Sequence, residues 1–129
     1  KVRQPASSTM MATVQRQDDI TIVEVQVDYD SLSGPAFDEI QRVLLAQAQS
    51  AEPPLVVLDL SHTDYIGSGF IETISRSWKR LTARNGCLVL CGVQPFCAEV
   101  IRTMRLDTLW KAYPTRADAL AAIGQFSAG

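Results

Sequence analysis

The chain has little net charge and no long apolar run. Its 129 residues include 12 basic and 14 acidic ones, a formal net charge of −2, so no overall positive field attracts nucleic acid or an anionic membrane. No apolar stretch approaches the roughly 20 residues that cross a bilayer, and we expect no direct membrane insertion. No charged-then-apolar leader opens the chain, which favours a cytoplasmic protein. The sequence leaves its oligomeric state open.

Residues that bind metals or form disulfides are also scarce. The three cysteines, Cys87, Cys91 and Cys97, have neither a paired spacing nor accompanying histidines, so we expect reduced, structural thiols. The single histidine, His62, is expected in a solvated loop, and no other ligand-type residues stand at metal spacing around it. We therefore expect no metal site and no organic cofactor.

The apolar residues that are present suffice for one domain core. They make up 47% of the chain, and their spacing predicts several strands. Alternation over residues 20–27 indicates a strand, preceded by a weaker candidate at 10–15, with Asp18-Asp19 as the hairpin turn. Two uniformly apolar runs, at 55–58 and 87–91, are typical of strands covered on both faces.

Between and after these strands, apolar residues recur at helical spacing. Helices are predicted at about 35–49, from about Ile71 to a stop at Asn85-Gly86, after Pro95, and from Thr115 to Ile123. A last short strand is expected at 109–113. The fold class is therefore α/β, a single domain with a mixed, mostly parallel sheet of about five strands and about four helices, in the order β-β-α-β-α-β-α-(β)-α. We expect a loose lead-in over 1–9, the domain over 10–124 and a short tail over 125–129.

In open parallel sheets, ligands and partners meet the chain where strands end and helices begin. Here that region is residues 61–70, in which Gly67-Ser68-Gly69 comes just before the second helix. Ser68 is either the N-cap of that helix, worth about 1 kcal/mol, or an exposed docking or phosphorylation point. A phosphate-loop spacing, a Walker lysine and a nucleophile elbow are all missing. We therefore expect no catalytic residues and no enzymatic activity.

The run from Asp59 to Ile71, DLSHTDYIGSGFI, resembles the signature of STAS domains, the family of bacterial anti-sigma factor antagonists. That signature is a strand ending in Asp-Leu-Ser, an aromatic and an aliphatic residue, and then Asp-Ser-Ser-Gly-Leu. The likeness continues without a gap and covers at least residues 20–123. It implies a regulator of transcription that changes partners. Unphosphorylated, such a protein binds an anti-sigma factor or related serine kinase, and phosphorylation of the second serine breaks the complex.

The chain departs from the signature at the switch itself. On the resemblance, Gly67 takes the aspartate position, Ser68 the first serine, Gly69 the phosphoacceptor position and Phe70 the following glycine. Glycine has no hydroxyl, so the usual phosphoserine is absent. Either Ser68 accepts phosphate from a shifted position, or the protein shares the family's docking while being regulated otherwise, which we favour. The Phe70 ring is expected in the core rather than exposed as an interface anchor.

The same resemblance implies a partner surface made of the 64–70 turn, the first turns of the second helix and the loop after the second strand. In that loop Asp28 matches an aspartate that family members use against the kinase, and Asp30 competes for the role. The expected partner-binding residues are Asp28, Asp30, Asp64, Tyr65, Gly67, Ser68, Gly69, Phe70, Glu72, Thr73 and Arg76.

Further along the second helix, Arg76, Arg80 and Arg84 share one face, which is expected to be either solvated or in contact with an acidic partner or lipid headgroup. Glu72 and Arg76 stand at the spacing of a helical ion pair. An alternative function is a STAS subunit or segment that regulates a membrane transporter. Nucleotide binding is a third hypothesis.

Overall fold

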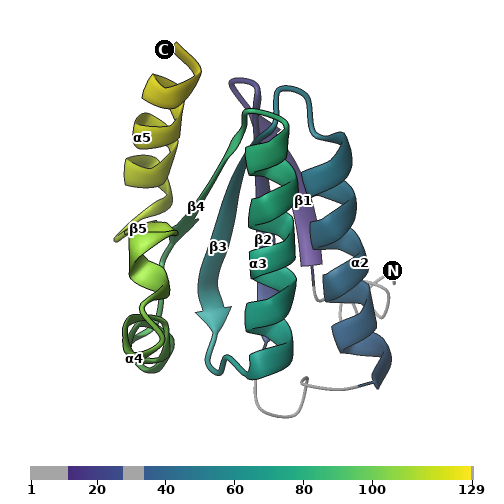
Figure 1. Ribbon diagram of the computed structural model, residues 1–129, viewed down its shortest axis with the longest axis vertical. Coiled ribbons are helices and arrows are strands. Elements are labelled where there is room, and N and C mark those ends of the chain that lie inside the picture. The colour runs from purple at the N-terminus through teal and green to yellow at the C-terminus, as the bar shows by residue number, and fades with distance from the viewer. Residues whose placement is uncertain (1–11, 28–33, 129) are drawn as a thin grey trace, which may run out of the picture.

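A five-stranded sheet forms the centre of the molecule, and helices cover both of its faces (Figure 1). The computed structural model describes residues 12–27 and 34–128. The strands are β1 (Ala12–Gln17), β2 (Ile20–Val27), β3 (Leu55–Thr63), β4 (Cys87–Cys91) and β5 (Lys111–Tyr113). The helices are α2 (Gly34–Ser50), α3 (Ser68–Ala83), α4 (Pro95–Thr103) and α5 (Arg116–Ala128), with a 3-10 helix, η2 (Leu106–Thr108).

The strands lie in the sheet in their chain order, β1-β2-β3-β4-β5. β1 pairs with β2 antiparallel, and every later neighbour pairs parallel. The α/β class and the mixed, mostly parallel sheet are therefore confirmed. The expected hairpin turn is confirmed as well, because Asp18 and Asp19 both have positive φ, 53° and 69°, between paired Gln17 and Ile20. Two successive positive φ angles are typical of the type I′ turn that suits a two-residue hairpin.

Two apolar cores flank the sheet. The larger lies under α2, α3 and α4, where Val56, Leu58 and Leu60 of β3 meet helix residues such as Leu44 and Ile74. The smaller lies on the opposite face, where alternate strand residues pack against Ala119 and Ile123 of α5. Because successive strand residues point to opposite faces, each central strand contributes to both cores. This explains the uniformly apolar runs in β3 and β4.

The boundary between α3 and β4 depends on two residues with different roles. Asn85 takes the left-handed conformation, with φ of 63°, that ends the helix. Gly86 allows a close approach, because a Cβ there would lie 2.1 Å from the carbonyl oxygen of Pro54. The expected stop at Asn85-Gly86 is thus confirmed, with the left-handed residue being the asparagine.

Two element boundaries differ from those expected, and the pairing of β2 with β3 is irregular. β3 continues through Thr63, so His62 lies on a strand and not in a solvated loop, although its side chain is exposed. The register between β2 and β3 shifts between Glu24 and Gln26, where β3 holds an extra residue. At the other end of the chain, α5 extends beyond Ile123 to Ala128.

Two of the three arginines expected to share one face of α3, Arg80 and the C-cap residue Arg84, contact α2, whereas Arg76 is exposed. Arg84 donates to the carbonyl oxygens of Ala48 and Ala51 at 2.9 and 2.7 Å and pairs with Glu52. Arg80 donates to the carbonyl oxygen of Leu45 at 3.3 Å. These guanidinium groups satisfy carbonyls at the C-terminal end of α2, where the helix dipole also favours positive charge. The two arginines therefore tie α3 to α2.

The cysteines are free thiols, as expected. Cys91 and Cys97 are buried, and Cys97 donates to the carbonyl oxygen of Thr63 at 3.6 Å. Burial, together with the nearby charge of Asp59, raises the pKa of Cys91 to about 12. Burial and the charge of Asp64 raise the pKa of Cys97 to about 11. Both side chains pack as small apolar groups.

Candidate functional site

The candidate site lies at the edge of the sheet where the parallel strands end. The N-terminal ends of α2 and α3 point to this edge beside α4 (Figure 1). Gly67 is the N-cap of α3, with extended backbone angles (φ −119°, ψ 177°) and no side-chain capping bond. Of the two alternatives for Ser68, the N-cap role is therefore wrong. Ser68 is instead the first helical residue, and glycine at the cap position costs only a few tenths of a kcal/mol relative to serine.

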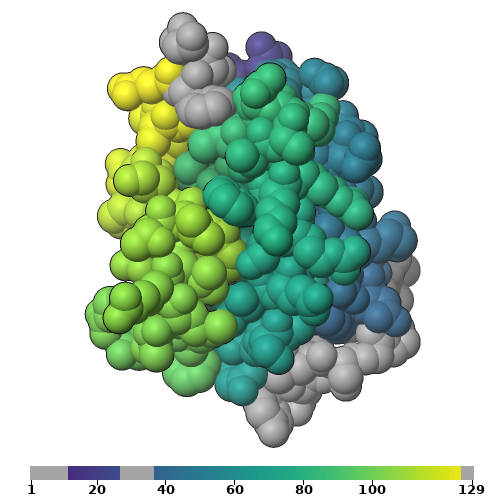
Figure 2. All heavy atoms as spheres, viewed as in Figure 1, coloured from purple at the N-terminus to yellow at the C-terminus, as the bar shows by residue number. Residues whose placement is uncertain are grey.

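Ser68 and Gly69 are exposed at the start of α3. Figure 2 shows this end of α3 at the molecular surface next to α4. A hollow of about 280 Å³ lies at the turn, lined by Phe37, Tyr65, Gly67, Ser68, Gly69 and Phe70. A Cβ at Gly69 would stand 3.4 Å from the Phe37 ring, so glycine at this position keeps the hollow open. Aromatic side chains thus lie around the start of α3, where Ser68 is exposed.

Two of the expected partner-binding residues begin the turn between β3 and α3. Asp64 is exposed, and Tyr65 is half-buried. The Tyr65 ring stacks on Phe96 of α4, with ring centroids 5.3 Å apart and planes inclined by 17°. Phe96 remains 50% exposed. This contact joins the turn before α3 to the start of α4, and sequence reasoning missed Phe96 because the pairing depends on the sheet order.

The remaining expected partner-binding residues differ in how exposed they are. Phe70 is 1% exposed, so its ring enters the core as expected. Thr73 is fully buried, donates to the carbonyl of Gly69 at 3.0 Å and accepts from Gln41, which removes its side chain from any contact surface. Glu72 and Arg76 are exposed. Asp28 and Asp30 lie outside the described residues.

Glu72 and Arg76 do not form the expected ion pair: within the described residues, no ion pair joins their side chains. Both therefore extend from α3 as separate exposed charges.

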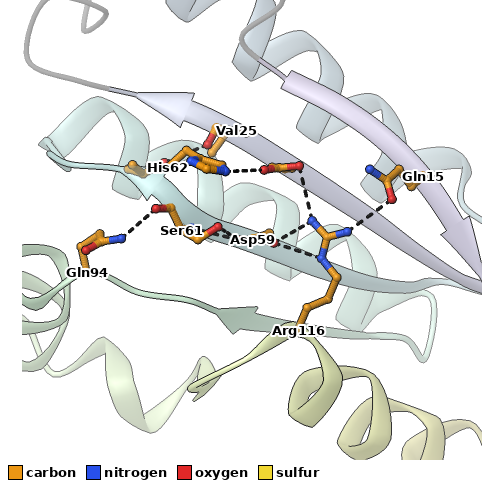
Figure 3. Close-up of polar contacts among 9 residues, drawn as sticks. Gln15, Val25, Asp59, Ser61, His62, Gln94 and Arg116 are labelled. Atoms are coloured by element: carbon orange, nitrogen blue, oxygen red, sulfur yellow. Dashed lines mark hydrogen bonds and ion pairs between the residues drawn. The ribbon is translucent and has the colours of Figure 1, made fainter.

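On the α5 side of the sheet, a polar network joins the ends of β2 and β3 to α5 (Figure 3). Arg116, the first residue of α5, donates from Nε and Nη2 to Oδ2 of Asp59 at 3.0 and 2.7 Å. The other carboxylate oxygen, Oδ1, accepts from the amide and hydroxyl of Ser61 at 2.9 and 2.7 Å. Arg116 also reaches Glu24 at 3.4 Å, and Glu24 pairs with Nε2 of His62 at 3.0 Å.

This network sets the charge state of Asp59. Burial by itself would raise the pKa of the carboxyl, but the hydrogen bonds from Ser61 and the Arg116 guanidinium outweigh it, so the pKa lies below its usual value. Burial would lower the pKa of Arg116, and Asp59 and Glu24 raise it instead. The pair is therefore ionised at neutral pH. It fixes α5 to β3 and is a structural element that sequence reasoning missed.

Ser61 also connects this network to the edge of the sheet where the candidate site lies. Its carbonyl oxygen accepts from Nε2 of Gln94, the N-cap residue of α4, at 2.7 Å. Thr63 donates from Oγ1 to the carbonyl of Val25 at 3.1 Å. The end of β3 is thereby held on both sides just before the 64–67 turn.

Within the described parts of the chain, no three His, Cys, Asp or Glu side chains gather as a metal site would require. None of the helices in those same parts is both long and apolar enough to cross a bilayer.

Comparisons with known proteins agree with this architecture. The family model described as "STAS domain" matches residues 11–119 of this chain. An anti-sigma-factor antagonist (STAS) domain protein from Planctomyces limnophilus is 32% identical, with a TM-score of 0.78 over 88% of this chain and 97% of that one. An anti-sigma factor antagonist from Mycobacterium paratuberculosis is 26% identical, with a TM-score of 0.70 over 88% and 92%. No curated protein matches by sequence.

A more distant likeness shows the fold alone. The murine anion transporter Slc26a9 shares 12% identity with a TM-score of 0.67, and the match covers 86% of this chain and 18% of the transporter. The family match spans most of the chain, whose sheet order is β1-β2-β3-β4-β5, with Asp59-Leu60-Ser61 inside β3 and the next helix starting at Ser68. This chain belongs to the STAS domain family.

Proposed function

We propose that this protein is a non-enzymatic, cytoplasmic regulator that binds an anti-sigma factor or related serine kinase through the 64–70 turn and the start of α3. The supporting observation is the exposed Ser68-Gly69 helix start beside a hollow lined by aromatic side chains. Exposed backbone at a helix start and half-buried aromatic rings are features of protein interfaces. Two structural relatives that share at least a quarter of the sequence are described as anti-sigma factor antagonists.

Regulation of the complex would differ from the family's usual switch. The phosphoacceptor position holds Gly69, which cannot be phosphorylated, while the neighbouring Ser68 hydroxyl is exposed. Asp64 and Glu72, both exposed, lie in the turn and one turn into α3, so a phosphate on Ser68 would add to existing negative charge. We favour regulation by the abundance or state of the partner over phosphorylation of this chain.

The test is capture of a partner in cells of the source organism, followed by binding measurements with that purified partner. Ser68→Glu places a charge in the turn, and Thr82→Glu places the same charge at the exposed far end of α3. We expect Ser68→Glu to weaken binding at least about tenfold and Thr82→Glu to leave it within about twofold. Equal binding by both variants, or turnover of a small substrate by the protein, would contradict the proposal.

A membrane-transporter partner is the second candidate. It is favoured by the glycine at the phosphoacceptor position and by the occurrence of the same fold within an anion transporter. Mass spectrometry of the captured partner separates the two, because a permease or transport ATPase supports this candidate and a kinase-like protein supports the first.

A further inference from the structure

We infer that the partner surface extends beyond the turn onto α4 through the stacked pair Tyr65 and Phe96, and that it fits a protein segment presenting an apolar side chain flanked by basic ones. This inference rests on the proposed function and names the chemistry of the partner. It adds Phe96, which lies outside the family's signature run, as the anchor of the interface.

The aromatic pair has the character of an interface anchor. Phe96 is 50% exposed. Elsewhere on the described chain, the other exposed large apolar side chains are Val14, Met104 and Leu109. Its ring is held by the stack on Tyr65, at a centroid distance of 5.3 Å. A ring that is already held loses little conformational freedom when a partner covers it, and aromatic residues of this kind dominate interface energies.

The hollow beside the stack determines what can enter. Its volume of about 280 Å³ falls just below the range of roughly 300–1,000 Å³ typical of small-molecule sites. The half-buried side chains of Phe37 and Tyr65 line the hollow, and Gly69 adds no side chain to the opening. This size and lining suit an aliphatic side chain of a protein, such as leucine, better than a nucleotide or another organic cofactor.

The charges around the hollow are acidic. Asp64 is exposed next to Tyr65, and its charge acts on Cys97, which places it beside the first turn of α4. Asp38 and Glu72 are exposed one turn into α2 and α3. The exposed arginines of the same two helices, Arg42 and Arg76, stand a further turn from the strand ends. The complementary partner therefore carries basic residues around its apolar side chain.

Two short peptides test this chemistry without knowledge of the partner. We would titrate the ¹⁵N-labelled protein with acetyl-Arg-Leu-Leu-Arg-amide and with acetyl-Glu-Leu-Leu-Glu-amide, at low salt. The basic peptide is expected to shift the amide signals of residues 67–70 and of Phe96, and the acidic peptide is expected to leave them in place. Equal shifts from both peptides, or shifts confined to other surfaces, would overturn the inference.

Variants locate the anchor. Phe96→Ala is expected to weaken the basic peptide about three- to tenfold, the range of an aromatic contact converted at about 1.4 kcal/mol per factor of ten. Met104→Ala is the matched control, because Met104 lies just after the other end of α4 and is 51% exposed. Asp64→Asn should weaken the basic peptide and reduce its salt dependence. An equal loss in Met104→Ala would show that α4 contributes only general apolar surface.

The captured partner separates this inference from the proposed function. If that partner responds to Ser68→Glu but binds Phe96→Ala as tightly as wild type, the inference fails and the proposed function stands. If no partner depends on Ser68, the proposed function fails, and the peptide titration still decides whether this surface selects apolar and basic chemistry.

Discussion

Arg116 begins α5 and places two nitrogens on a single carboxylate oxygen of Asp59, at 2.7 and 3.0 Å, across 57 residues of chain. The opposite oxygen of Asp59 is occupied by Ser61, and Ser61 in turn accepts from Gln94 at the start of α4. The carboxylate of Asp59 thus contacts α5 directly and is linked to α4 through Ser61. Asp59 lies in the middle of β3, and its bonds support the strand that leads to the candidate partner surface.

Replacing this carboxylate should change the dependence of stability on pH. Because the pKa of Asp59 lies below its usual value of 3.8, the folded chain holds fewer protons than the unfolded chain as acid is added. Its contribution is therefore complete above about pH 4 and is lost as the pH falls through the folded pKa. Asp59→Asn should lower the free energy of unfolding at pH 7 by about 2 kcal/mol.

Urea unfolding at pH 7 and at several values below pH 4 measures both effects. The matched control is Asp107→Asn, at an exposed aspartate of η2. Asp59→Asn should flatten the acid side of the stability curve, and Asp107→Asn should leave the curve close to that of wild type. A variant that keeps the wild-type acid slope would show that Asp59 is not the group responsible.

The close approach at Gly86 predicts a strong effect from one methyl group. A Cβ at this position would lie 2.1 Å from the carbonyl oxygen of Pro54, so the backbone must move to admit it. Gly86→Ala should therefore lower the free energy of unfolding by about 2 kcal/mol or more. Gly124→Ala is the matched control, because nothing lies within 4 Å of its Cβ and alanine is favoured in a helix by about 1 kcal/mol. Thermal unfolding should shift in opposite directions for the two variants.

The contact of Arg84 with α2 also has a matched control on its own helix. Arg84→Gln removes hydrogen bonds to the carbonyls of Ala48 and Ala51 and should destabilise the fold by about 1–2 kcal/mol. Arg76→Gln, at an exposed arginine of α3, should change stability by no more than about 0.5 kcal/mol. Chemical denaturation of both variants gives the comparison. Similar changes in the free energy of unfolding for the two variants would show that the contacts of Arg84 with α2 do not stabilise the fold.

Ser68 should matter for binding and not for folding. Its hydroxyl makes no cap bond, the cap position belongs to Gly67, and alanine is a better helix former than serine. Ser68→Ala should therefore alter the free energy of unfolding by less than about 0.5 kcal/mol. Denaturant titration checks this expectation, and a loss well above that limit would mean that Ser68 contributes to the fold.

The sequence predicted the sheet and helices well because apolar periodicity alone carries that information. The alternation of β2 and the uniform runs of β3 and β4 reflect which faces are covered, and burial follows directly from the residue types. The polar end of β3, including Ser61 and His62, was not predicted as strand because its residues are polar and do not follow an alternating apolar pattern. The cap was misassigned because glycine and serine are both accepted there.

Contacts between segments that are distant in the sequence could not be predicted from apolar periodicity. The bonds from Arg84 to α2, from Arg116 to Asp59 and from Tyr65 to Phe96 each require the order and register of the strands. The expected exposure of Ser68 is confirmed at the start of α3, where Gly69 is exposed as well. The burial of Thr73 and the aromatic stack on α4 became visible only when the strand ends and helix starts were assembled.

The central claim is that the start of α3 contacts a protein partner, and site-specific photo-crosslinking in living cells tests it most directly. A photoreactive p-benzoylphenylalanine is introduced at Ser68, and in a parallel strain at Thr82, which is exposed at the other end of the same helix. We predict a discrete crosslinked protein from position 68 and none from position 82. Crosslinking from position 82 alone, or from neither position while a partner still binds, would contradict the claim.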